Sequence, residues 1–100
     1  FADNVVATEN ISIQVINASG VSGMAQRLER VLLHKGANVV SITGAQQTQR
    51  RSQIKYYGDE TYTLDKITKL LGFPVSKLSN ETIAKIVIII GEDNKNSTLF

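Results

Sequence analysis

Hydrophobic residues along the chain follow two periods, one typical of strands and one typical of helices. Short apolar runs predict strands at residues 11–17, 38–43, 53–57 and 85–90. Apolar residues spaced by three and four predict one helix from about residue 21 to 35 and another from about 61 to 71. The predicted order is therefore strand, helix, strand, strand, helix, strand.

The first predicted helix has the clearer amphipathic pattern. Its apolar residues fall on one face: Val21, Met24, Ala25, Leu28, Val31 and Leu32. Ser19 or Ser22 is expected to cap its start, because a side-chain oxygen satisfies one of the free N–H groups there. Gly36 is expected to end this helix, and Gly72, followed by Pro74, to end the second.

The order of the elements predicts an α+β fold. A right-handed crossover makes the first two strands parallel. We predict a βαββαβ two-layer sandwich of ferredoxin-like topology: a four-stranded sheet, the third strand between the first two, and both helices on one face. The last strand is apolar without alternation at residues 86–90, so we expect it to be covered on both faces or by a partner. At a sheet edge, it would pair with a second copy or a parent domain.

Composition fits one small domain. The chain has 100 residues, of which 42% are hydrophobic. We assign residues 11–93 to the domain, residues 1–10 to a linker and residues 94–100 to a flexible tail. A net charge of only +2 argues against nucleic-acid binding, and the absence of cysteine excludes disulfides. No apolar run is long enough to span a bilayer, and since the chain begins with Phe1, we expect any membrane segment to lie upstream.

The junction between the first strand and the first helix is the strongest candidate for a binding site. A helix start exposes backbone N–H groups, and glycines allow close approach to them. Parallel first and second strands place this junction at the same sheet edge as the loop at residues 43–52, which carries two arginines. We predict a shallow site for a phosphate or carboxylate on an extended polar ligand. Its residues are Asn17, Ser19, Gly20, Ser22, Gly23, Arg50, Arg51 and Lys55. In the alternative interpretation, the glycines serve only the turn and the arginines are solvated.

The sequence contains no evident catalytic constellation. His34 is expected to be a cation at a helix end rather than a base. Glu92 and Asp93 supply too few oxygens for a metal site, so we interpret them as capping or solvated residues. Ser19 and Ser22 lack a nearby base and a nucleophile-elbow motif. We therefore predict a protein that is not an enzyme, with no catalytic residue, no metal and no cofactor.

Four segments resemble the LytR C-terminal domain family. Residues 17–25 (NASGVSGMA) are similar to its N-G-T-G-x-x-G-L-A opening, and residues 52–56 (SQIKY) to its T-x-I-x-Y strand. Residues 70–72 (LLG) match the close of its second helix, and residues 88–93 (IIIGED) resemble its final V-V-L-G-x-D. The sequence departs from these motifs at Ala18, Ser19, Met24 and Ser52, where the family has Gly, Thr, Leu and Thr. Alanine at the first of these positions implies that the turn does not need a positive φ there.

The resemblance implies a role in the bacterial cell envelope. The family often follows the catalytic domain of LytR–CpsA–Psr proteins, membrane-anchored enzymes that transfer glycopolymers to peptidoglycan outside the cell. That catalytic domain is not in these residues. The resemblance implies a non-catalytic, extracytoplasmic binding module that is tethered through an upstream region. The expected partner is an anionic cell-wall glycopolymer, peptidoglycan or an envelope protein, and we expect a monomer or weak dimer.

Two other classes of protein remain open. The order of elements also resembles the ACT domain, a regulatory module that binds amino acids at such a turn, although Ser19 stands where that family usually has proline. An RNA-binding sheet needs aromatic residues at successive same-face positions. Tyr56 and Tyr57 are adjacent and face opposite sides, so we predict core and edge roles for them and no nucleic-acid partner.

Overall fold

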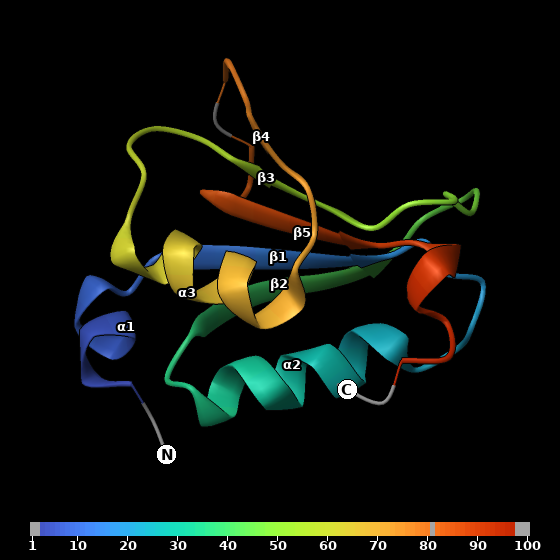
Figure 1. Cartoon of the computed structure of the whole chain (residues 1–100), viewed down its shortest axis with the longest axis horizontal. Helices are drawn as coiled ribbons and strands as arrows, with labels where there is room; N and C mark the ends of the chain where they lie inside the picture. Colours follow the sequence, from blue (N-terminus) through green and yellow to red (C-terminus); the bar gives the residue numbers. More distant parts are fainter. Residues whose placement is uncertain (1–2, 81, 98–100) are drawn as a thin grey trace.

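A five-stranded mixed sheet with helices packed against it makes up the structure (Figure 1). The computed structural model describes residues 3–80 and 82–97; residues 1–2 of the expected linker and 98–100 of the expected tail lie outside this part. In chain order the elements are α1 (Asn4–Glu9), β1 (Ser12–Asn17), α2 (Met24–His34), β2 (Asn38–Gly44), β3 (Gln53–Tyr56), α3 (Tyr62–Leu71), β4 (Val75–Lys77), β5 (Ile86–Ile90) and the 3-10 turn η1 (Glu92–Asn94). The four predicted strands and both predicted helices are confirmed as elements, although the first helix begins at Met24 rather than near residue 21.

The strand order differs from the prediction. The order in the sheet is β2-β1-β5-β3-β4. β1 runs parallel to both β2 and β5, while β3 is antiparallel to β5 and parallel to β4. The four-stranded ferredoxin-like arrangement is therefore wrong: β1 lies directly beside β2, and β3 lies beyond β5. The predicted parallel pairing of the first two strands is confirmed.

β5 is the central strand of the sheet, which explains its continuous apolar sequence. All five of its residues are buried. The even-numbered ones face the helices, and Val87 and Ile89 lie on the other face beside Ile16 and Ala18. β1 and β3 pair with its two edges, so an edge position for this strand, with pairing to a second copy, is wrong.

One main hydrophobic core lies between the sheet and the α-helices. Val6 of α1, Leu32 of α2 and Ile67 of α3 belong to the same cluster as the inward residues of β1, β3 and β5. Because one cluster joins all these elements, the described α-helices share one face of the sheet. The predicted placement of both long helices on one face is therefore correct.

Residues 4–9, which we expected to belong to a linker, form α1 instead. Asp3 caps this helix, because its Oδ1 accepts hydrogen bonds from the N–H groups of Val5 and Val6 at 2.9 and 3.2 Å. Val6 is 4% exposed and packs into the core. Six residues that include two β-branched valines carry too weak a helical pattern to be predicted without this packing.

Glu9 joins α1 to the start of α3. Its carboxylate accepts hydrogen bonds from the N–H groups of Tyr62 and Thr63 at 3.2 and 2.7 Å, and from the Thr63 hydroxyl at 2.6 Å. Thr61 is the N-cap of α3, and its Oγ1 accepts a bond from the N–H of Leu64 at 3.2 Å. Side chains from two segments thus satisfy the helix start, which fixes α1 against α3.

β4 is an additional strand that the sequence pattern does not predict. It is only three residues long, and all three are exposed. Backbone hydrogen bonds flank it: the N–H of Ile54 donates to the carbonyl of Pro74 at 2.8 Å, and the N–H of Leu78 donates to the carbonyl of Tyr56 at 2.7 Å. The pairing comes from backbone contacts, so no hydrophobic period marks it.

Candidate binding site at the rim of the sheet

The C-terminal ends of β1, β2 and β5 meet at one edge of the sheet, at the right of Figure 1. We define the rim as residues 17–23, 44–52 and 90–94. The N–H of Ala45 donates to the carbonyl of Asn17 at 3.0 Å, and the N–H of Gln49 donates to the carbonyl of Ala18 at 2.9 Å. The arginine-bearing loop therefore lies against the junction of β1 and α2, as the parallel pairing of the first two strands predicts.

The turn after β1 uses the side chains of Asn17 and Ser19 internally. Asn17 Oδ1 accepts hydrogen bonds from the Ser19 N–H at 3.1 Å and the Ser19 hydroxyl at 2.6 Å. Asn17 Nδ2 donates to the carbonyl of Val21 at 2.8 Å, and the N–H of Val21 donates to Ser19 Oγ at 3.1 Å. Ser19 is 3% exposed. These two predicted site residues shape the turn, and their polar side-chain atoms are engaged within it.

The glycines of the turn have left-handed backbone conformations. Gly20 has a φ of +81° and Gly23 a φ of +86°, which favour glycine at both positions. A Cβ on Gly20 would also lie 3.1 Å from Thr48 Cγ2, so this glycine allows the loop to approach. Ala18 is not among the residues with positive φ, which confirms that the turn does not need glycine there.

The start of α2 has no side-chain cap. Gly23 is its N-cap residue, and no side chain bonds to the helix start, so the predicted capping by Ser19 or Ser22 is wrong. Ser22 is exposed beside this helix end. The first N–H groups of a helix have no partner within the helix. The helix start at the rim therefore has hydrogen-bond donors that no side chain satisfies.

Two of the three predicted cationic residues lie at the rim. Arg50 and Arg51 are exposed and form no ion pair with any residue that the structure describes. The carbonyl of Arg50 accepts a hydrogen bond from the N–H of Asp93 at 3.0 Å, which fixes the backbone of the loop. Lys55 lies elsewhere: it pairs with Val87 inside the sheet, on the face opposite the α-helices. The rim thus brings the arginines, but not the lysine, beside the junction.

A hydrogen-bonded cluster around the buried Ser52 hydroxyl fastens the arginine-bearing loop to the end of β5. We call Ser52, Gly91, Asp93 and Asn94 the Ser52 cluster. Ser52 is 1% exposed, and its hydroxyl donates to Asp93 Oδ1 at 2.7 Å. Ser52 Oγ in turn accepts hydrogen bonds from the Gly91 N–H and from Asn94 Nδ2, each at 2.8 Å. Asp93 Oδ1 also accepts a bond from the Ser52 N–H at 3.0 Å. One hydroxyl therefore joins two chain segments.

The Ser52 cluster was not predicted from the sequence. Asp93 was expected to be a capping or solvated residue; it is exposed, and its carboxylate also binds a serine 41 positions away. The available signal was indirect: Ser52, Gly91 and Asp93 all fall in the segments that resemble family motifs. The structure gives these positions a physical reason, because each takes part in the contact between the loop and β5.

In the part of the chain that the structure describes, three carboxyl groups have pKa values below their ordinary range. Burial raises the pKa of Asp93, but hydrogen bonds from Ser52 and Asn94 outweigh it and lower the pKa. The side-chain hydrogen bond from Thr63 is the main cause that lowers the pKa of Glu9. For Asp3, burial raises the pKa, and hydrogen bonds from Tyr62 and the α1 backbone more than offset this. All three groups are stabilised in their charged form.

The free energy of unfolding is expected to fall as the solution is acidified. A carboxyl group whose pKa is lower in the folded chain than in the unfolded chain stabilises the fold at pH values above the unfolded pKa. The unfolded pKa is 4.5 for Glu and 3.8 for Asp. This contribution disappears as the pH falls through the folded pKa. Urea unfolding between roughly pH 7 and pH 2 measures the effect, and Glu9→Gln should reduce the slope. A stability that stays constant below pH 4.5 would contradict the expectation.

Neither a metal site nor a membrane-spanning helix occurs among residues 3–80 and 82–97. No group of His, Cys, Asp and Glu side chains in these ranges is arranged to hold a metal ion. None of the helices found there combines the length and the apolar character needed to cross a membrane. His34 lies in the last turn of α2, where a cation suits the helix dipole.

The mixed sheet, the helices on one face and the hydrogen-bonded rim define a small α+β domain. The chain belongs to the LytR cell envelope-related transcriptional attenuator family, whose model matches residues 10–93. The resemblance to the LytR C-terminal domain is thereby confirmed. The ACT-like alternative is not retained for two reasons. It depended on a four-stranded βαββαβ order, whereas the sheet has five strands, and the family model that matches the chain is that of the LytR family.

Two solved structures have the same fold. The soluble domain of a conserved hypothetical secreted protein from Mycobacterium marinum has a TM-score of 0.68 at 14% identity, over 92% of this chain and 64% of that chain. The C-terminal domain of RV0431 has a TM-score of 0.57 at 22% identity, over 81% of this chain and 71% of that chain. The chain thus spans 64% of the length of the Mycobacterium marinum domain. No curated protein matches this chain in sequence.

Proposed function

We propose that this chain is a non-catalytic, extracytoplasmic accessory module of a cell-envelope protein, and that its rim contacts an anionic cell-wall glycopolymer. Membership of a cell envelope-related family and likeness to a domain of a secreted protein support the location. The main support for a contact at the rim is the 2.9 Å hydrogen bond from the Gln49 N–H to the Ala18 carbonyl. This bond holds the loop with Arg50 and Arg51 against the start of α2.

The rim offers an anion two kinds of hydrogen-bond donor. The start of α2 at Gly23 presents backbone N–H groups and the positive end of the helix dipole. Arg50 and Arg51 present planar guanidinium groups that form charge-assisted hydrogen bonds to phosphate or carboxylate. A polymer with repeated negative charges engages both at once, whereas a single small anion engages one. Affinity is therefore expected to rise with polymer length and to fall with salt.

The remaining predicted residues have supporting parts in this proposal. Asn17, Ser19 and Gly20 set the shape of the turn, and Ser22 lies exposed beside the helix start. Lys55 lies on the face of the sheet opposite the α-helices, so the contact at the rim does not require it. The proposed site is thus carried by the two arginines and the backbone at Gly23.

A phosphorylated oligosaccharide is expected to shift the amide resonances of residues 19–25 and 49–52 in an NMR titration. Arg50→Gln with Arg51→Gln should weaken its binding at least about tenfold, because each arginine loses a charge-assisted hydrogen bond. Arg30→Gln is the matched control, since Arg30 is an exposed arginine on α2 away from the helix start. The same oligosaccharide without phosphate should leave these resonances in place.

Three results would count against the proposal. The first is that the rim resonances do not move. The second is that Arg30→Gln weakens binding as much as the double variant. The third is that the oligosaccharide without phosphate binds as tightly as the phosphorylated one. The last result would replace the anion site with sugar recognition. Retention of the wild-type circular dichroism spectrum by each variant separates a loss of binding from a loss of fold.

A further inference from the structure

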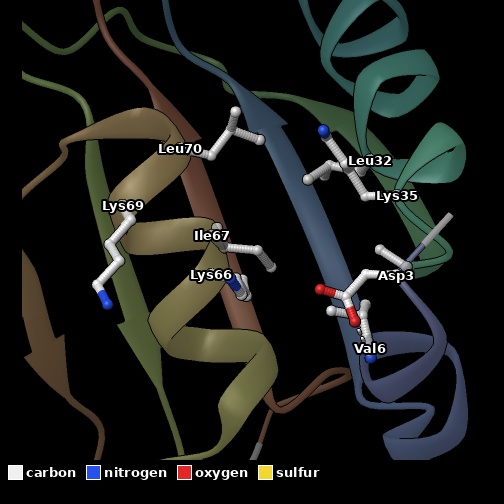
Figure 2. A pocket seen from close by; sticks show the side chains of 9 residues that line it. Asp3, Val6, Leu32, Lys35, Lys66, Ile67, Lys69 and Leu70 are labelled. Carbon is white, nitrogen blue, oxygen red and sulfur yellow. Dashed lines mark hydrogen bonds between the residues drawn. The ribbon is translucent and has the colours of Figure 1, made fainter. Parts of the chain in front are cut away.

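A groove of about 510 Å³ lies between α1, α3 and the C-terminal end of α2 (Figure 2). Figure 1 places these elements at the opposite end of the molecule from the rim. The groove is lined by Asp3, Val6, Leu32, Lys35, Ala37, Lys66, Ile67, Lys69 and Leu70. Its volume falls within the range of roughly 300–1,000 Å³ that is typical of small-molecule sites.

The floor of the groove is apolar and firmly held. Val6, Leu32 and Ile67 come from three different helices and belong to the main core. Figure 2 shows the side chains of Leu32 and Ile67 directed toward the space between α2 and α3. The N–H of Asp3 donates to the carbonyl of Lys35 at 2.9 Å, which fixes the start of α1 against the end of α2. Together with the bonds of Glu9 to α3, this contact makes the groove a preformed feature.

The mouth of the groove carries excess positive charge. Lys35 and Lys66 lie on opposite walls in Figure 2, and neither forms an ion pair with a described residue. Lys66 Nζ lies 5.3 Å from the centre of the Tyr62 ring. Asp3 is the one carboxylate in the lining, and its oxygens already accept bonds from the start of α1 and from the Tyr62 hydroxyl at 2.8 Å. Lys69, the third lysine of the lining, pairs with Asp65 at 3.1 Å.

We propose that this groove binds a single-chain amphiphile with an anionic head group. The alkyl chain lies over Val6, Leu32 and Ile67, where contact with the apolar floor removes hydrocarbon from water. The head group accepts charge-assisted hydrogen bonds from Lys35 and Lys66. A neutral amphiphile gains only the first contribution and a small anion only the second, so the combination selects the ligand. Phosphate and carboxylate heads share this chemistry. The site is separate from the rim and does not depend on the glycopolymer proposal.

Titration of the chain with dodecyl phosphate, below its micelle concentration, tests the groove. Saturable NMR shifts are expected at Val6, Leu32 and Ile67, at lower ligand concentrations than any shift of the rim resonances. Lys35→Gln with Lys66→Gln should weaken binding at least about tenfold through the loss of two charge-assisted bonds. Lys77→Gln is the matched control and should leave the affinity unchanged, because Lys77 is an exposed lysine on β4 that does not line the groove. Dodecyl maltoside, which has a neutral head, should bind at least about tenfold more weakly than dodecyl phosphate.

Laurate, titrated in the same way, identifies the head group: tighter binding than dodecyl phosphate assigns a carboxylate, and weaker binding assigns a phosphate. Either result supports the proposal. It is overturned if neither anionic amphiphile gives saturable shifts at the groove, or if dodecyl maltoside binds as tightly as both. It is also overturned if Lys77→Gln weakens binding as much as the double variant, since attraction to general surface charge would then explain the result.

Discussion

Replacing Gly91 with alanine is expected to lower the free energy of unfolding by about 3 kcal/mol. A Cβ at this position would lie 2.6 Å from the backbone nitrogen of Ser52 and 2.7 Å from the carbonyl oxygen of Arg51, and closer still to the Arg51 carbonyl carbon. These are backbone atoms, which cannot rotate aside as the tip of a side chain can. The φ of Gly91 is −97°, a conformation open to any residue, so the cost comes from crowding alone.

Gly44→Ala is a matched control for this experiment at the same rim. A Cβ on Gly44 would meet no atom within 4 Å, and its φ is not positive. We therefore expect this variant to remain within about 0.5 kcal/mol of the wild type. Urea unfolding followed by circular dichroism measures both. Equal urea midpoints for Gly91→Ala and the wild type would show that the loop moves away to accommodate the added Cβ. This result would contradict a rigid contact between the loop and Gly91.

The elements that the sequence predicts are those whose hydrophobic pattern extends over enough consecutive residues to show a period or an unbroken apolar run. α2 and α3 each carry several turns of spaced apolar residues, and β5 carries an unbroken apolar run. α1 and β4 escape prediction because they are short and depend on contacts with distant segments. The strand order is missed for a related reason: local patterns fix each strand, but the choice of neighbours depends on packing across the whole sheet.

The candidate site was predictable only where topology alone determines it. Parallel β1 and β2 must end at the same edge, so the junction at Gly23 and the loop with Arg50 were expected to be neighbours. The contact of Ser52 with Asp93 joins segments 41 residues apart, and no sequence period relates them. The groove is also built from three separate helices, and its lysines occupy ordinary surface positions of those helices. Side-chain convergence of this kind follows from tertiary packing.

Loss of the Ser52 hydroxyl is the second substitution with a large expected effect. Ser52→Ala should lower the free energy of unfolding by about 2–3 kcal/mol, because it leaves the buried N–H of Gly91 without a partner and removes a hydrogen bond to a charged carboxylate. The pKa of Asp93 should rise toward its ordinary value of 3.8, since the Ser52 hydroxyl is one of the groups that lower it. Urea unfolding and an NMR pH titration of Asp93 measure the two effects separately.

Ser52→Thr is the matched control, because threonine keeps the hydroxyl and is the residue that the family motif carries at this position. It should retain both the low pKa of Asp93 and most of the stability, although Ser52 is 1% exposed and has little room for the added methyl group. Comparison of the two variants therefore separates the effect of losing the hydroxyl from the effect of changing the side-chain volume. If Ser52→Ala and Ser52→Thr lowered the stability equally while the pKa of Asp93 stayed low in both, crowding around β5 would hold the rim together. The hydrogen bonds of Ser52 would then contribute little to the placement of Arg50 and Arg51, and the rim would depend mainly on the close approach at Gly91.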